Sequence, residues 1–334
     1  MTTHTIEGRC RAVVHHVITG GNGQAPPLLY AWTAAMHTRV DIAVVARTLS
    51  ADEALEAVEA AARLITDIEA EADRFCPSSP LSAFNAAPAG QWVPLPPRLT
   101  AVMEQCVGLA AATSGLFDVT VGSDNHDAST IRQLRVRTDA AMKCRDGLRV
   151  DLCGYIKGVA ADEVAALLRS RGVTDALISL GNSSVVAMGD MRSRGSGWSV
   201  RHAADTVLMR CCRHTAEGCE QHDVGCEQHY VGCEQHYGGC EPHGVGSGGA
   251  PSASMPMPDG GITLHDEALT TSGNDSPTRR HIVNPLTGRM VTGMRQVAVV
   301  TPTAALGEAL STALFAADSQ QWQRVADNFS LHRV

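Results

Sequence analysis

The chain of 334 residues has few aromatic residues, no excess of positive charge and no long apolar segment. Aromatic residues make up 4% of it, and no apolar run approaches the roughly 18 residues that a membrane-spanning helix needs. The formal net charge is −8, and no basic stripe with interleaved aromatic residues is present, which argues against a nucleic-acid partner. The hydrophobic content of 44% predicts a globular chain with a large core and no membrane span.

The N-terminus also lacks the charged segment followed by an apolar segment that marks a secretory signal. We therefore expect a cytoplasmic protein. Five of the eleven cysteines are scattered without the spacing of a disulfide framework, which is typical of small buried residues in a reducing compartment. They are Cys10, Cys76, Cys106, Cys144 and Cys153.

Apolar periodicity predicts helices and strands that do not alternate regularly enough for a doubly wound sheet, so we expect a mixed α+β fold. Ser50 and Glu53 form a capping box for a helix that ends near Arg74, and a second helix follows Pro96–Pro97. Further helices are expected over 159–171 and from Pro302 onward, and strands over 39–47, 148–152, 175–180, 197–203 and 295–300.

The domain organisation follows from two stretches of atypical composition. Residues 1–32 have weak periodicity and several Gly and Pro residues, which predicts a loosely attached N-terminal segment. Residues 211–260 form a Cys/His/Gly-rich insertion that divides one domain, residues 33–210 and 261–334. Within it, Gly-Cys-Glu-Gln-His recurs with a period of seven. The repeat is either a zinc- or copper-binding tract or a tandem duplication tolerated in a surface loop.

Three polar residues near the C-terminus indicate phosphoryl chemistry. His281 lies at a Pro/Gly turn, and Glu308 and Thr312 lie four residues apart, so they project from one face of an expected helix. Carboxylate and hydroxyl oxygens are ligands that Mg²⁺ prefers. Each half alone is also compatible with a simpler interpretation, a histidine in a turn and a solvated helix face.

Five segments, in order along the chain, resemble motifs of one family. Residues 74–85 resemble RFxxxSxLSxLN, residues 115–122 resemble GAFDxTVG, and residues 149–158 resemble LDLGGIAKG. Residues 271–273 with 281–288 resemble TSG followed by HIxDPxTG. These are motifs of the ApbE family of flavin transferases, and the resemblance extends over roughly residues 33–328. It implies an ApbE-like α+β fold, mainly antiparallel sheets with packed helices and a nucleotide cleft between two subregions.

The resemblance also implies an activity, the magnesium-dependent transfer of FMN from FAD to a Thr or Ser hydroxyl of an acceptor protein, with release of AMP. By the same resemblance His281 is the catalytic base, and Mg²⁺ is held by Glu308, Thr312 and the main-chain carbonyl of Ile156. The residues that the resemblance places against FAD are Met36, Asp118, Lys157, Gly181, Asn182, Thr271 and Ser272. For Lys157, a solvated position at a helix start is an equally simple interpretation, and Asp118 also fits the end of a strand.

Several positions depart from the family pattern. Glu308 replaces an Asp, Asn284 replaces an Asp and His37 replaces a Gly. Asn182, Ser183 and Ser184 replace most of a small Gly-Gly-Asp turn, and the segment 123–146 is shorter than in the family, which we interpret as a loss of cleft wall. Two alternatives to transfer therefore stay open: a flavin-binding protein or FAD hydrolase without transfer activity, and a metal-binding protein that works through the Cys/His repeat.

Overall fold

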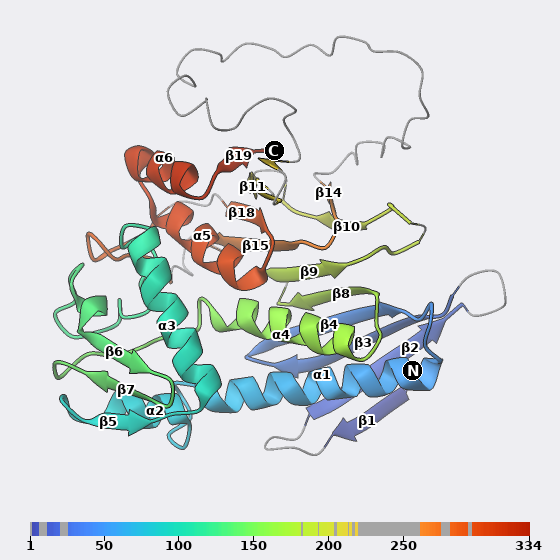
Figure 1. The fold of residues 1–334 in the computed structure, drawn as a ribbon, viewed down its shortest axis with the longest axis horizontal. Helices are drawn as coiled ribbons and strands as arrows, with labels where there is room; N and C mark the ends of the chain where they lie inside the picture. Colours follow the sequence, from blue (N-terminus) through green and yellow to red (C-terminus); the bar gives the residue numbers. More distant parts are fainter. Residues whose placement is uncertain are drawn as a thin grey trace, which may run out of the picture.

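The computed structural model describes residues 2–6, 12–20, 26–181, 183–192, 194–203, 206–212, 214–215, 218–219, 261–274, 281–292 and 296–334. Its main element is a ten-stranded sheet with the order β1-β2-β3-β4-β8-β9-β15-β18-β11-β19 (Figure 1). In sequence order these strands are β1 Thr2–Ile6, β2 Ala12–Thr19, β3 Leu28–Ala35, β4 Thr38–Val45, β8 Asp175–Leu180, β9 Ser184–Met188, β11 Thr206–Cys211, β15 Ala268–Gly273, β18 Gln296–Thr301 and β19 Leu331–Arg333.

Neighbouring strands of this sheet are antiparallel except for β11 and β18, which are parallel. The smaller sheets pair β10 (Trp198–Arg201) with β14 (Gly261–Leu264), β12 (His214–Thr215) with β13 (Gly218–Cys219), β16 (Val283–Asn284) with β17 (Arg289–Met290), and β5 (Trp92–Pro94) and β6 (Leu134–Arg137) with β7 (Ala140–Lys143). The expectation of a mixed α+β fold with mainly antiparallel sheets is therefore confirmed.

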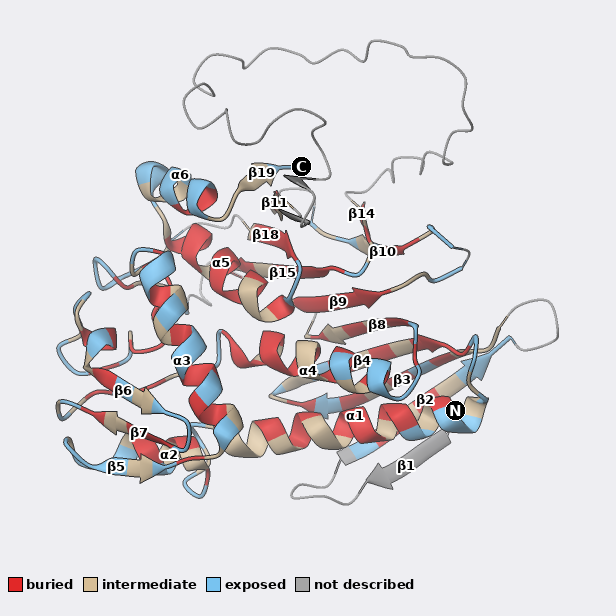
Figure 2. Cartoon of the chain, in the orientation of Figure 1, coloured by how far each residue is buried: buried red, intermediate tan, exposed pale blue. Residues whose placement is uncertain are grey.

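The helices are α1 (Ala51–Ala72), α2 (Pro80–Ala86), α3 (Pro97–Ala112), α4 (Ile156–Ser170), α5 (Ala304–Ala316) and α6 (Ser319–Asn328), with a 3₁₀ turn η1 (Thr130–Gln133). Figure 1 shows α1, α4 and α5 across one face of the large sheet, with α3 and the three-stranded sheet at its end. Their inward faces are buried (Figure 2), and the core between helices and sheet includes the fully buried Ile65, Ile68 and Leu168.

The start of α1 follows the sequence prediction. The Ser50 hydroxyl accepts a hydrogen bond from the Glu53 amide, and the Glu53 carboxylate accepts one from the Ser50 amide, which completes the expected capping box. For α5 the predicted start is two residues early. The helix begins at Ala304 with Thr303 as its N-cap, and Pro302 precedes the cap.

The N-terminal segment differs from the loosely attached lead-in that we expected for residues 1–32. Strands β2 and β3 are hydrogen-bonded members of the large sheet, and Val14, Leu29 and Ala31 are each 1% exposed. Two adjacent histidines, His15 and His16, interrupt the apolar alternation of β2, so the strand periodicity was not recognised in the sequence.

The strand predicted over residues 148–152 is wrong, because this stretch pairs with side chains and a turn. The Val150 amide donates to Asn85 Oδ1 at 2.8 Å, and Asn85 Nδ2 donates to the Val150 carbonyl at 2.9 Å. The Asp151 amide donates to the Val119 carbonyl at 2.8 Å. An asparagine amide on α2 thus satisfies backbone groups that a neighbouring strand would otherwise satisfy.

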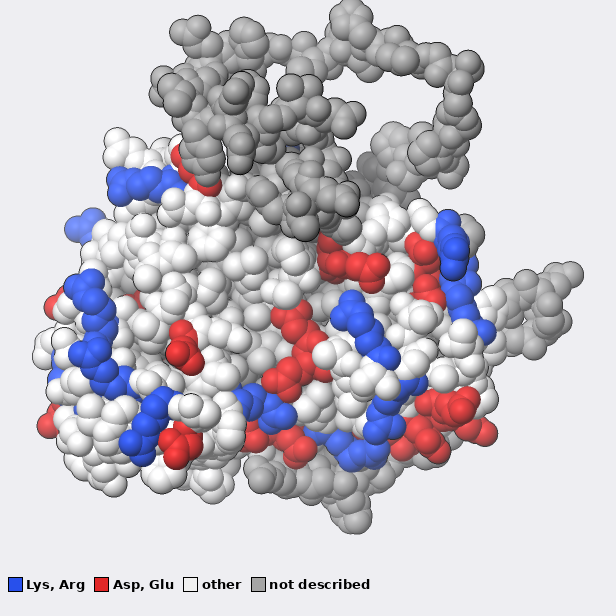
Figure 3. All heavy atoms as spheres, in the orientation of Figure 1, with Lys and Arg blue, Asp and Glu red and all other residues white. Residues whose placement is uncertain are grey.

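The Cys/His repeat lies outside the described residues, apart from Gly218 and Cys219 in β13. Both interpretations of the repeat therefore stay open. None of the described helices is long and apolar enough to span a membrane. On the face drawn in Figure 3, basic and acidic side chains are interspersed and form no continuous basic stripe.

Candidate active site

A single large cavity collects most of the residues singled out in the sequence. Its volume is about 1310 Å³, and its wall includes the outward face of β4, β8, β9 and β15, the start of α4 and one side of α5. Eight of the eleven predicted site residues line it: Asp118, Lys157, Gly181, Thr271, Ser272, His281, Glu308 and Thr312. Met36 and Ile156 are not in its wall, and Asn182 lies outside the described residues.

The carboxylate of Glu308 is the most unusual group in this cavity. α5 places the residue so that it is only 3% exposed, and the Ser184 hydroxyl at the start of β9 donates a hydrogen bond to its Oε1. Burial raises the pKa of Glu308 to about 7, although the nearby Lys157 charge and the Ser184 hydrogen bond lower it. A carboxylate that is desolvated beyond what its partners compensate is suited to binding a cation.

Lys157 also has a defined partner at this site. Its Nζ donates to the Ser183 hydroxyl at 2.6 Å, and both residues line the cavity. The interpretation of Lys157 as an ordinary solvated residue is therefore not what the geometry shows. Its ammonium lies in the cavity wall, where it is available to an anionic ligand.

The hydroxyl of Thr312 lies one helical turn beyond Glu308 and belongs to a chain of hydroxyl groups. Thr312 Oγ1 is 3.1 Å from Ser272 Oγ, which is 2.8 Å from Ser311 Oγ. The neighbouring Thr271 amide donates to the Ser183 carbonyl at 2.8 Å and so ties β15 to the turn before β9. The expectation that Glu308 and Thr312 share one helix face fits their position in the same cavity wall.

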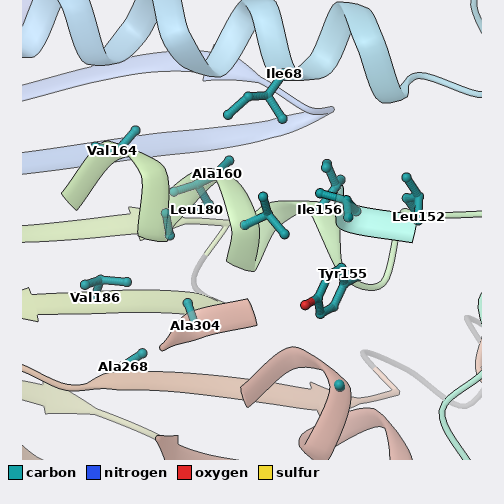
Figure 4. Packing of buried hydrophobic residues seen from close by; sticks show 14 of the residues in the cluster. Ile68, Leu152, Tyr155, Ile156, Ala160, Val164, Leu180, Val186, Ala268 and Ala304 are labelled. Atoms are coloured by element: carbon teal, nitrogen blue, oxygen red, sulfur yellow. The ribbon is translucent and has the colours of Figure 1, made fainter. Parts of the chain in front are cut away.

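The side-chain oxygens of Glu308 and Thr312 are of the chemical type that Mg²⁺ prefers. Among the described residues there is no group of three or more His, Cys, Asp or Glu side chains that would form a metal cluster. A site built from one carboxylate, one threonine hydroxyl and a main-chain carbonyl does not need such a group, and its ligands are all oxygen. Figure 4 shows the Ile156 side chain within the core, where the residue is 8% exposed, so only its main chain can contribute to a site.

His281 is exposed and opens the described segment 281–292, whose fold depends on Asn284. Asn284 Oδ1 accepts hydrogen bonds from the Leu286 amide at 2.9 Å and the Thr287 amide at 3.1 Å. Asn284 Nδ2 donates to the Ala316 carbonyl at 2.8 Å. An Asp, the residue of the family motif, would accept the first two bonds but could not donate the third, so Asn284 adds a link to the end of α5.

Met36 and Gly181 both have left-handed backbone conformations, but only Gly181 belongs to the cavity wall. Met36 and His37 have φ values of +53° and +56° and form the two-residue turn between β3 and β4. The Met36 amide donates to Glu69 Oε1 at 2.7 Å, and its side chain packs on the core. Gly181 has a φ of +65°, and a Cβ atom there would lie 2.4 Å from Thr38 Oγ1, so the position requires glycine.

Asp118 belongs to the cavity wall, but its carboxylate is almost wholly enclosed. Its side chain is 2% exposed, and its Oδ1 accepts hydrogen bonds from the Thr120 amide and hydroxyl at 2.7 and 2.6 Å. Its Oδ2 lies 2.9 Å from His126 Nε2. Asp118 therefore organises the loop that lines the cavity.

Sequence reasoning missed His126, which supports this loop. It comes from the segment 123–146, which we had interpreted only as lost cleft wall. The segment instead supplies the Asp118 partner and continues into η1, β6 and β7. Its position eight residues after Asp118 gave no signal, because the contact depends on a turn without regular periodicity.

Comparisons with known proteins agree with this architecture. The family model described as the ApbE family matches residues 36–217 and 249–333. A protein from Rhodobacter capsulatus described as an FAD:protein FMN transferase is 26% identical over 287 residues, which cover 76% of this chain. The match spans 45% of that relative, so the chain corresponds to about half its length.

Solved structures show the same fold at low sequence identity. The flavin transferase ApbE from Vibrio cholerae has a TM-score of 0.64 at 18% identity, over 96% of this chain and 92% of its own. An ApbE protein from Thermotoga maritima has a TM-score of 0.63 at 18% identity, over 92% of this chain and 94% of its own. The ApbE-like fold expected from the motifs is therefore confirmed, and the chain belongs to the ApbE family.

Proposed function

We propose that the protein is a magnesium-dependent transferase that moves FMN from FAD to a Thr or Ser hydroxyl of an acceptor protein and releases AMP. The observation that supports it most directly is the buried Glu308 carboxylate in one cavity wall with Thr312, Lys157 and His281. The curated relative is named for the same activity, and the family motifs fall on these residues.

The residues divide the reaction between them. Glu308, Thr312 and the Ile156 carbonyl would hold Mg²⁺, which when bound supplies positive charge against the pyrophosphate. Lys157 contacts a phosphate oxygen from the same wall. His281 accepts the proton of the acceptor hydroxyl, whose oxygen forms a bond to the FMN phosphorus. The bond from that phosphorus to the bridging oxygen breaks, and AMP leaves with that oxygen.

One observation favours a second candidate, an FAD-binding protein or FAD hydrolase without transfer. Ser184 donates to Glu308, and Ser183 accepts from Lys157, so two hydroxyls engage the groups meant for the cation and the phosphate. If these hydrogen bonds persist with FAD bound, positioning of the pyrophosphate is weakened. Water would then be the acceptor in place of a protein hydroxyl.

Labelling of an acceptor separates the two candidates. The protein is incubated with FAD, Mg²⁺ and a threonine-containing acceptor domain, and covalent flavin is followed by in-gel fluorescence. A transferase labels the acceptor, His281→Ala eliminates the label, and a chelator does the same. His265→Ala, a histidine substitution outside the cavity, retains the label. FAD cleavage without a labelled acceptor would support the hydrolase instead.

A further inference from the structure

We propose that an extended segment of the acceptor protein docks in the cavity as an added strand on the free edge of β10, opposite a Tyr30–Arg39–Asp41 surface. This inference rests on the proposed transfer activity and specifies how its protein substrate reaches the site. The hydroxyl-bearing residue of that segment then lies over the wall formed by β15 and α5.

The first observation concerns how β10 meets the cavity. Five consecutive residues, Ser199 to Ala203, line it, and the first three belong to the strand. Successive side chains of a strand point to opposite faces, so one face of β10 alone would contribute only every second residue. An uninterrupted run indicates that the edge of the strand, with its backbone groups, faces the cavity.

The second observation is that this edge has no strand partner among the described residues. β10 pairs with β14 in a two-stranded sheet and with no other described strand. An unpaired strand edge presents backbone donors and acceptors to an extended chain, and strand addition is a common way to bind a peptide. Main-chain pairing would also allow docking with little dependence on acceptor sequence.

The third observation is a preorganised polar aromatic surface on β3 and β4. The Tyr30 hydroxyl donates to Asp41, and Arg39 donates through Nε to Asp41 at 2.8 Å and through Nη2 to Tyr30 at 2.9 Å. The Arg39 guanidinium lies 5.4 Å from the Trp32 ring centroid. Tyr30 is 37% exposed and lines the cavity together with Arg39 and Asp41. Tyr, Trp and Arg are the residues most often dominant at protein interfaces.

The dimensions leave room for two substrates. The cavity of about 1310 Å³ exceeds the roughly 300–1,000 Å³ of a pocket for one small molecule. The register places Asp41 opposite Ser179, Ser179 opposite Val185 and Val185 opposite Leu269. Three strand spacings, roughly 14 Å, therefore separate Asp41 from β15, a distance that about four or five extended residues cover.

The test uses a library of synthetic peptides, each with one central threonine in random flanking sequence, incubated with the full-length protein, FAD and Mg²⁺. The best-labelled peptide is then resynthesised with a backbone N-methyl group at each position in turn. Strand addition predicts that kcat/KM falls about tenfold or more at alternate positions only, because alternate amides face the partner strand. A labelled peptide whose profile lacks this alternation overturns the proposal. FAD cleavage with no peptide labelled would instead favour the hydrolase and refute the proposed transfer activity. Loss of both FAD binding and cleavage would instead refute the proposed function.

Variants of the opposite wall give a second readout. Tyr30→Ala and Arg39→Ala are each expected to raise the peptide KM about tenfold while the Kd for FAD, measured by flavin fluorescence, stays unchanged. Val13→Ala, a 42% exposed position on β2 outside the cavity wall, should change neither. A rise in the Kd for FAD would assign the surface to the dinucleotide and overturn the proposal. So would a dimer in sedimentation that excludes the peptide, since a second copy would then occupy the edge.

Discussion

The Ser184 hydroxyl donates a hydrogen bond to the buried carboxylate of Glu308, which lies 124 positions away in the chain. The contact joins the first residue of β9 to the second turn of α5, two elements that contribute to the cavity wall. This hydrogen bond lowers the pKa of Glu308 by less than burial raises it, so the pKa is still about 7. The carboxylate is thus held ready for a positive partner, and its protonation affects stability when none is bound.

The first prediction concerns the pH dependence of the metal-free protein. The folded pKa of Glu308 is about 7 against an unfolded value of 4.5, so the folded state binds the proton more tightly. The resulting stability is fully present below pH 4.5 and is lost as pH rises through 7, by about 3 kcal/mol. Urea unfolding in a chelator should show this loss, and Glu308→Gln should remove it. Glu104→Gln, an exposed control, should leave the slope unchanged, and equal slopes for the wild type and Glu308→Gln would refute the assignment.

The second prediction concerns the turn before β9. Gly181→Ala should destabilise the protein by about 2 to 4 kcal/mol, because a Cβ atom would lie 2.4 Å from Thr38 Oγ1 at a φ of +65°. Gly90→Ala has a φ of +78° with nothing within 4 Å, so it should cost only the backbone strain, about 1 kcal/mol. Adding Thr38→Ala to Gly181→Ala should recover the difference between the two. Denaturant midpoints measure all three variants, and equal losses at Gly181 and Gly90 would contradict the steric explanation.

The sequence predicted those parts of the fold and site that are encoded locally. The capping box of α1 and the Glu308/Thr312 spacing on α5 each depend on residues within one element, and both were predicted correctly. The motifs also identified most of the cavity wall. By contrast, the contacts of Ser184 with Glu308 and of His126 with Asp118 are made by tertiary packing, and no spacing in the sequence encodes them.

Some differences between the predicted and the observed fold arise where a distant or unexpected side chain replaces the expected partner. The extended stretch around Val150 has the composition of a strand, yet Asn85 takes both of its hydrogen bonds. Similarly, β2 was overlooked because His16, which is 6% exposed, occupies an inward position where the pattern called for an apolar residue. Composition alone cannot distinguish these cases, since the partner lies far away in the chain.

The third prediction concerns the support of α5 by α4. Asp162 accepts the Ala304 amide on Oδ1 and the Ala305 amide on Oδ2, each at 2.8 Å, and so caps the helix that carries Glu308. Asp162→Asn keeps one acceptor and turns an NH₂ group toward an amide, so unfolding free energy should fall by about 1 to 2 kcal/mol. Asp52→Asn on the exposed first turn of α1 should cost less than about 0.5 kcal/mol. A smaller loss at Asp162 than at Asp52 would show that α5 does not depend on this cap.

The fourth prediction decides between the two interpretations of the Cys/His repeat. Deleting residues 220–248, all of which lie in the gap between the two matched stretches 36–217 and 249–333, should leave FAD binding and acceptor labelling unchanged. Shortening a connection between two elements changes its closure entropy only slowly, so the thermal midpoint should shift by less than about 3 °C. Zinc uptake, measured by calorimetry on both proteins, then separates the alternatives. Equal uptake by the full chain and the deletion variant identifies the repeat as a tolerated duplication. Uptake that is lost with the repeat, and also lost when its cysteines are changed to serine, identifies a metal-binding tract.

A deletion that abolishes acceptor labelling while FAD still binds would show instead that the repeat takes part in catalysis, contrary to the arrangement proposed above.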